Sequence, residues 1–211
     1  FQSFNDFLAV LTARKRKQIR KERATVAEQG IVLKTLSGAD LDFAFWQQFY
    51  GFYCDTYQKR SRHNGYLTAE TFRLWGQTMA KRIVVFAAFA DEKMLAASLC
   101  FQSETTLYGR YWGCAEDFNF LHFECCYYSG IEYCIKQGLQ FFDAGAQGEH
   151  KLQRGFAPVL RHGFYQFTEK AQHKALNEAI ARYCLQEQKA LEQYRQEAEL
   201  SLPFANRVDE R

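Results

Sequence analysis

Side chains that can transfer protons and hold anions gather in one short segment of this sequence. Glu149 and His150 can accept a proton, and Lys151 and Arg154 can hold a phosphate or a carboxylate. The segment follows an apolar, aromatic-rich run that ends at Asp143 and is typical of a β-strand. In open α/β folds ligands bind outside the carboxyl ends of strands, so this segment is the first candidate for a working site.

Glycines bracket the same segment. Gly145 and Gly148 predict a turn directly after the strand, and a residue without a Cβ lets backbone N–H groups approach a substrate closely. The alternative is an ordinary surface turn whose charges are simply solvated. The residue types and their spacing leave both interpretations open.

Composition limits the class of protein. The chain has 211 residues, of which 47% are hydrophobic and 17% aromatic, which is ample for a packed core. The sequence has no apolar run long enough to cross a membrane and no charged-then-apolar leader at its start. It begins with Phe1 rather than Met, so we expect it to be part of a longer protein.

The seven cysteines indicate neither disulfides nor a metal site. Their number is odd and they form no C-x-x-C pair, which favours free thiols in a reducing, cytoplasmic compartment. His122, Glu124 and Cys125 are metal-capable types close together, but the P-C-x-x-C partner of zinc deaminases is absent. We therefore expect no metal.

A strongly basic run lies near the start of the chain. Residues 14–23 hold seven basic residues against one acid, in a chain whose net charge is +3. Such a run is either one solvated face of a helix or a surface that binds the phosphates of RNA, of a nucleotide or of an anionic lipid headgroup. The candidate phosphate-binding residues are Arg14, Lys15, Arg16, Lys17, Arg20 and Lys21.

Hydrophobic periodicity predicts the elements that must position these residues. Helices are expected over Ser3–Glu28, from Ala39 or Asp40 to Lys59, from Thr68 to Ala80, over Leu121–Gln137 and over Glu169–Leu200. Strands are expected over Ile31–Leu36, Ile83–Ala90, Met94–Gln102, Thr106–Cys114, Leu139–Ala144 and Gly163–Thr168. Three consecutive strands followed by a strand–helix–strand unit predict a mixed central sheet with an antiparallel meander and helices on both faces, in a single α/β (α+β) domain.

Several motifs resemble those of a known family. The order of elements is similar to that of the GNAT acyltransferase superfamily, and the motifs resemble the FemAB-like family of predicted N-acyltransferases of peptidoglycan biosynthesis or recognition. The resemblance covers most of the chain and implies a GNAT-like fold, here as the C-terminal half of a longer protein with a preceding GNAT-like half. The motifs are R-K-R-x-x-I-R-K-E at Arg14–Glu22, T-Y-x-K-R at Thr56–Arg60, Y-L-T at Tyr66–Thr68, Y-W-G-C at Tyr111–Cys114 and G-A-Q-G-E-H-K-x-x-R-G-F at Gly145–Phe156.

The resemblance implies transfer of an acyl or aminoacyl group to an amine, such as that of a peptidoglycan precursor. The donor would be a co-substrate, an aminoacyl-tRNA or an acyl-CoA, with no permanently bound cofactor. One departure bears on this choice, because the glycine-rich pyrophosphate loop of acetyl-CoA-using enzymes is replaced by a segment with Glu116 and Asp117 and no glycine. This favours an aminoacyl ester on tRNA.

Amine attack on a carbonyl requires a proton acceptor and donors for the developing oxyanion. The catalytic candidates are Glu149 and His150, followed by His122 and Glu124. A non-catalytic GNAT-fold module that binds a cell-wall precursor, RNA or a protein remains the alternative, and the basic run also allows peripheral contact with an anionic membrane. The candidate substrate-binding residues are Tyr111, Trp112, Asp143, Gly145, Gly148, Lys151, Arg154 and Arg60.

Overall fold

A computed structural model describes residues 1–145, 149–160, 162–164 and 173–201. The chain divides into two compact units, one of residues 1–8 with 16–147 and one of residues 9–15 with 148–211. The first unit contains the β-sheet and the helices that pack on it. Among the described residues no helix is both long and apolar enough to span a bilayer.

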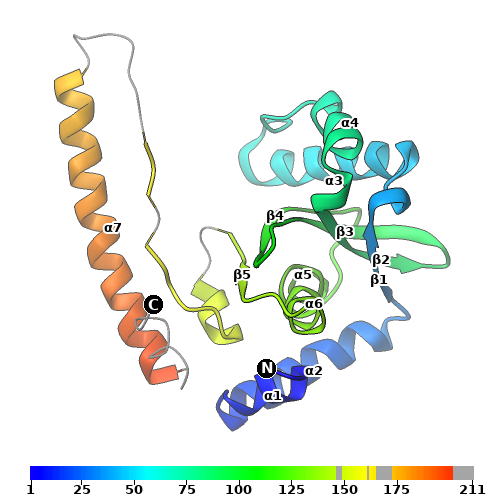
Figure 1. Cartoon of the computed structure of the whole chain (residues 1–211), viewed down its shortest axis with the longest axis horizontal. Helices are drawn as coiled ribbons and strands as arrows, with labels where there is room; N and C mark the ends of the chain where they lie inside the picture. The colour runs from blue at the N-terminus through cyan, green and yellow to red at the C-terminus, as the bar shows by residue number, and fades with distance from the viewer. Residues whose placement is uncertain (146–148, 161, 165–172, 202–211) are drawn as a thin grey trace. The chain divides into compact units, whose positions relative to one another are not determined.

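The sheet has five strands in the order β1-β2-β3-β4-β5 (Figure 1). The first four strands are antiparallel to their neighbours, whereas β4 and β5 are parallel. This confirms the predicted mixed sheet, with a meander that leads into a strand–helix–strand unit. The strands are β1 (Val32–Ser37), β2 (Ile83–Ala90), β3 (Lys93–Gln102), β4 (Thr106–Cys114) and β5 (Phe141–Asp143).

Two of the predicted strands differ from the structure. The strand expected over Leu139–Ala144 is shorter, because Gln140 and Phe141 donate their backbone N–H groups to the Thr105 carbonyl and the pairing with β4 ends at Asp143. A strand was also predicted over residues 163–168. Gly163 and Phe164 do not belong to a strand, and residues 165–168 lie outside the described residues.

Helices cover both faces of the sheet, as predicted. α3 (Phe43–Ser61) and α4 (Ala69–Thr78) pack on one face, where Phe49, Phe52 and Phe72 meet Val85 and Leu99. On the other face Val26, Leu121 and Cys134 pack against β2 and β3. These residues come from α2 (Ala13–Glu28) and from a continuous helical segment made of α5 (Leu121–Phe123), a π-helical turn η3 (Glu124–Tyr128) and α6 (Ser129–Gln137).

The prediction of a single helix over residues 3–28 was wrong. The structure has α1 (Phe4–Ala9) and then α2, with a break between them. The guanidinium of Arg23 lies 4.5 Å from the ring centroid of Phe4. An unbroken helix would separate these two residues by about 28 Å, so the chain must turn back on itself.

The remaining helices largely follow their predicted signals. α3 begins at Phe43, later than expected, because Asp42 caps it by accepting a hydrogen bond from the Phe45 backbone N–H at 2.8 Å. Gly138 ends α6 in the left-handed conformation, as predicted. The other elements are η1 (Gly38–Asp40), η2 (Ala80–Arg82), η4 (Glu149–Arg154) and the long α7 (His173–Ser201), whose expected start at residues 169–172 lies outside the described residues.

An unusually close contact sets the position of α3 against β4. A Cβ atom placed on Gly113 would lie 2.4 Å from the Phe52 Cβ and 2.5 Å from its backbone carbonyl carbon. Only glycine leaves room for a helix backbone at this distance. The missing side chain of Gly113 therefore lets α3 approach the end of β4.

Gly113→Ala should lower the free energy of unfolding by roughly 1–3 kcal/mol, because the methyl group meets helix backbone that cannot move aside cheaply. Gly51 provides the matched control, since a Cβ there meets nothing within 4 Å and Gly51 lies within α3. Gly51→Ala should raise stability by about 0.5–1 kcal/mol. Urea unfolding of both variants tests this, and equal effects would show that the contact at Gly113 is not tight.

Candidate functional site

β4 extends well beyond its parallel neighbour. The last residue pair between the two strands is Tyr108 with Asp143, whereas β4 continues to Cys114. Against β3, Cys100 pairs with Gly109 and Leu99 with Tyr111, so Arg110 is an extra residue that forms a β-bulge. Bulges re-aim strands and are common beside active sites. Residues 109–114, called here the β4 end, form the carboxyl end of a strand where ligands bind in open sheets.

Aromatic side chains from α3 surround one face of the β4 end. The Tyr111 ring lies 5.4 Å from that of Tyr53, which in turn lies 4.7 Å from Tyr57. The Thr56 hydroxyl donates a hydrogen bond either to the Trp112 carbonyl, at 3.2 Å, or to a carbonyl of its own helix. Thr56 and Tyr57 belong to the T-Y-x-K-R motif, and Tyr111 and Trp112 to Y-W-G-C. Two motifs that are distant in sequence therefore meet at this point.

The turn between α3 and α4 brings a third motif to the same place. The Tyr53 hydroxyl accepts hydrogen bonds from the backbone N–H groups of Tyr66 at 2.8 Å and Leu67 at 3.1 Å. A Cβ on Gly65, whose φ is +87°, would lie 2.4 Å from the Tyr53 ring. These contacts fix a turn on which the Tyr66 side chain is 81% exposed and lies 5.8 Å, ring to ring, from Tyr57.

Polar groups on this turn and on the last turns of α3 can act on a ligand. His63 Nδ1 accepts a hydrogen bond from the Gly65 backbone N–H at 3.0 Å, which places the proton of a neutral imidazole on Nε2. Burial, followed by the neighbouring tyrosines, raises the pKa of Tyr57, so its hydroxyl stays protonated at neutral pH and remains a donor. Lys59, Arg60 and Arg62 are exposed beside these groups.

His122 lies on the other face of the β4 end. Its imidazole is 5.3 Å from the Trp112 ring and 5.4 Å from the Tyr127 ring, both in edge-to-face geometry. In a regular α-helix, side chains five residues apart point in directions about 140° apart around the helix axis, whereas a π-helical turn brings them close together. The π-helical turn η3 therefore places Tyr127 against His122.

Glu124 has a partner that sequence reasoning did not foresee. Arg23 donates to both carboxylate oxygens, at 3.0 and 3.1 Å, and also to Glu132 at 2.7 Å. Burial raises the pKa of Glu124, although the nearby Arg23 acts in the opposite direction. Burial acts to lower the pKa of Arg23, but the carboxylates of Glu124 and Glu132 together raise it. The Glu124 side chain is only 6% exposed. This geometry favours anchoring α2 to η3 over transferring protons.

The predicted polar segment after β5 is divided between the two units. In the second unit residues 149–154 form the 3-10 helix η4. His150 is exposed and Lys151 half-buried, whereas Arg154 is 3% exposed and donates through Nη1 to the His150 carbonyl at 3.0 Å. Such burial favours a structural contribution from Arg154. Gly148 lies outside the described residues.

Asp143 and Gly145 belong to the first unit. The Asp143 Oδ1 atom accepts a hydrogen bond from the Gly145 backbone N–H at 3.0 Å. Gly145 has a φ of +81°, and a Cβ on it would lie 3.4 Å from the Gly109 carbonyl oxygen. The chain leaving β5 therefore runs close to the start of the β4 end.

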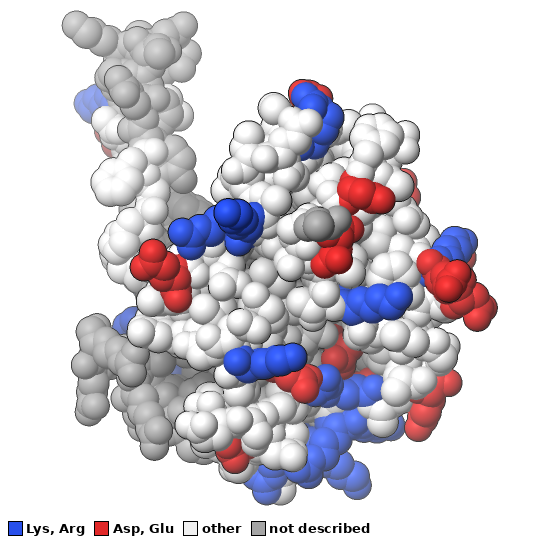
Figure 2. All heavy atoms as spheres, turned by 45° about the vertical axis from the view of Figure 1, so that its right-hand side comes forward, with Lys and Arg blue, Asp and Glu red and all other residues white. Residues whose placement is uncertain are grey.

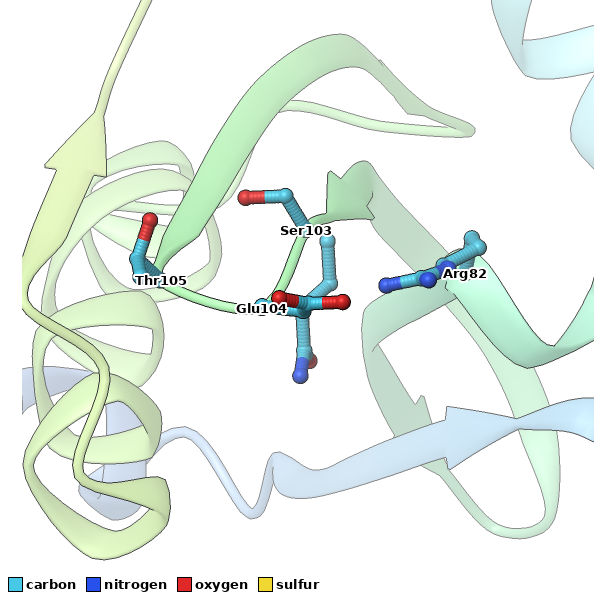
Figure 3. A pocket seen from close by; sticks show the side chains of 5 residues that line it. Arg82, Ser103, Glu104 and Thr105 are labelled. Carbon is cyan, nitrogen blue, oxygen red and sulfur yellow. The ribbon is translucent and has the colours of Figure 1, made fainter.

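A shallow hollow of about 380 Å³ lies at the opposite end of β4. Arg82 and Glu104 face each other across it (Figure 3). No predicted site residue lines it, and its exposed side chains do not favour a catalytic role. It is lined by Arg82, Gln102, Ser103, Glu104 and Thr105.

The described residues include no group of three or more His, Cys, Asp or Glu side chains that could hold a metal ion. All seven cysteines are free thiols. Burial raises the pKa of Cys134 to about 12 and that of Cys125 well above its ordinary value, so neither is an activated nucleophile.

Sequence reasoning missed three parts of this arrangement. The residue type of Arg110 gives no signal of a bulge, and the basic run gives no signal that Arg23 pairs with Glu124. Tyr57 and Tyr66 stood inside motifs that had been noted, but their roles as neighbours of Tyr111 depend on how α3 packs. The motif positions were the one usable signal.

Comparison with known proteins supports the family seen in these motifs. The fold is that of a mixed-sheet α/β domain in which the bulged strand β4 lies beside its parallel neighbour β5. The family model of FemAB-like proteins, described as peptidoglycan biosynthesis/recognition, matches residues 1–206, and the chain belongs to this family. No curated protein matches the sequence significantly.

Solved structures with a similar arrangement include acetyltransferases. A possible acetyltransferase from Clostridium difficile 630 is 8% identical, with 66% of this chain and 97% of that chain covered and a TM-score of 0.47. An aminoglycoside acetyltransferase from an uncultured soil metagenomic sample, in complex with sisomicin, is 14% identical, with 67% and 99% covered and a TM-score of 0.47. An aminoglycoside N-acetyltransferase in complex with CoA is 11% identical, with 66% and 95% covered and a TM-score of 0.44. None of these similarities assigns a residue role or a ligand to this chain.

Arg23→Gln should lower the free energy of unfolding by roughly 2–4 kcal/mol near neutral pH, because Glu124 is left buried without its cation. Loss of Arg23 also raises the pKa of Glu124 further. Below that pKa the carboxyl is neutral, so the stability loss should be smaller at mildly acidic pH than at neutral pH. Urea unfolding at both pH values measures this. A loss that is the same at both would show that Arg23 acts only by packing on Phe4.

Arg73→Gln, which breaks the exposed pair with Glu70, is the control and should change stability little.

Proposed function

We propose that this chain is the acyl-transfer domain of a FemAB-like N-acyltransferase and that its site is the β4 end. The observation that carries this proposal is the contact between Thr56 and the Trp112 carbonyl, together with the neighbouring rings of Tyr57, Tyr66 and Tyr111. Residues of three family-like motifs converge there on a bulged strand end.

The chemistry is attack of an amine on the carbonyl of an activated donor. Backbone N–H groups of the β4 end and the protonated hydroxyl of Tyr57 are suited to stabilise the oxyanion that develops on the carbonyl. His122 is the proton acceptor that lies beside the β4 end. Glu149 and His150, on η4, remain the other candidates for this step, with Lys151 and Arg154 as proposed substrate-binding residues.

The donor is proposed to be an aminoacyl-tRNA, used as a co-substrate without a permanently bound cofactor. Lys59, Arg60 and Arg62 are suited to hold the phosphates of such a donor. Glu116 and Asp117 are exposed where acetyl-CoA-using enzymes place a glycine-rich loop, and their negative charge opposes a pyrophosphate. An acyl-CoA is the second donor class.

The acceptor is proposed to be an amine of a peptidoglycan precursor, in the cytoplasm. The family description supports this class of substrate. A non-catalytic module that only binds such a precursor is the alternative. It would bind the precursor without transferring a group in the assay below.

Transfer can be tested by offering aminoacyl-tRNA or acyl-CoA with precursor peptides to the full chain and following the mass of the acceptor. If His122 is the proton acceptor, His122→Gln should slow transfer by roughly two to four orders of magnitude. Glu149→Gln and His150→Gln should transfer at the parent rate. If instead only the η4 variants lose activity, the base lies on η4. Binding of the precursor without any mass change would identify the non-catalytic module.

Acetyl-CoA should show no measurable binding by calorimetry at sub-millimolar ligand. The expected reason is the acidic segment at Glu116 and Asp117. The double variant Glu116→Gln, Asp117→Asn provides the control, because removing both charges should improve any residual binding. A micromolar dissociation constant for the parent protein would contradict the choice of an aminoacyl donor.

A further inference from the structure

The basic run is not explained by the β4 end, because α2 packs on the opposite face of the sheet from α3. Lys17, Arg20 and Lys21, called here the α2 cationic face, lie three and four positions apart and are all exposed. None of the three forms an ion pair within the described ranges. Lys and Arg side chains gather along the lower edge of Figure 2, where α2 lies in Figure 1.

Acidic and basic groups are sorted between the two sides of α2. Its inner side holds Glu22, which is 3% exposed and accepts hydrogen bonds from the Tyr128 hydroxyl and, at 2.9 Å, from Gln18. Arg23 is held by Glu124 and Glu132. The one acid of the basic run is therefore removed from solvent, and it does not neutralise the α2 cationic face.

These same contacts hold α2 firmly on the domain. Ile19 and Val26, the apolar residues of its inner side, are each 1% exposed. The helix therefore has no apolar face to insert into a bilayer core. Any ligand of the outer side is held at the surface and by charge alone.

We propose that the α2 cationic face binds the surface of an anionic lipid membrane. The exposed cations of α2 are complementary in charge to an anionic lipid surface, which attracts Lys and Arg side chains close to it. Proteins that bind single-stranded nucleic acid combine a charged groove with aromatic platforms. The sequence of α2 contains no aromatic residue that could serve as such a platform. This proposal does not depend on acyl transfer.

The test is sedimentation of the full chain with phosphatidylcholine vesicles that contain or lack phosphatidylglycerol. At low salt the protein should bind only the anionic vesicles, and about 1 M salt should release it, because the Debye length falls to about 3 Å. Replacing Lys17, Arg20 and Lys21 by Gln should reduce binding about 100-fold, since each cation near an anionic surface contributes about fivefold.

Two control variants make the result specific. Replacing Lys81, Arg82 and Lys93 by Gln removes the same charge from other exposed positions and should leave most of the binding intact. Lys17→Arg with Lys21→Arg keeps the charge and should bind as the parent does. Equal losses in both Gln variants would reduce the effect to net charge and overturn the proposal. Binding to tRNA but not to anionic vesicles would also overturn it.

Discussion

The close approach of α3 to the end of β4 is the constraint on which the rest of this structure depends. It exists because Gly113 has no side chain, so that the backbone at Phe52 can lie where a Cβ would otherwise be. One turn further along α3, Thr56 and Tyr57 consequently come within reach of Trp112 and, through Tyr53, of Tyr111. A side chain at position 113 would lift α3 and separate the groups that we propose to act together.

On the opposite face of the sheet, polar contacts add to the hydrophobic packing of Val26, Leu121 and Cys134 against β2 and β3. Arg23 and Glu22 fasten α2 to the π-helical turn, through Glu124 and Tyr128 respectively. That turn directly follows His122 and places Tyr127 against it. The two layers therefore reach the β4 end from different faces of the sheet. Both pack through apolar side chains, and the second is also held by buried hydrogen bonds and charge.

The sequence predicted the parts of this fold that depend on local pattern. The bounds of β2 and β4 were predicted correctly because their apolar residues form runs between clear turns, and Gly138 ended α6 as its type indicates. Tertiary contacts decided the rest. The break between α1 and α2 depends on Phe4 meeting Arg23, and the role of Glu124 depends on a partner 101 positions away. The π-helical turn and the bulge at Arg110 each result from one extra residue, which hydrophobic periodicity does not detect.

Hydrogen–deuterium exchange tests most directly whether the β4 end is the working site. Mass spectrometry of the ligand that the purified protein retains identifies the compound to add, and exchange is then compared with and without it. The account predicts protection of peptides that cover residues 109–114 and of those that cover residues 59–66, from the end of α3 into the following turn. Protection confined to residues 149–154, with unchanged exchange at the β4 end, would contradict it.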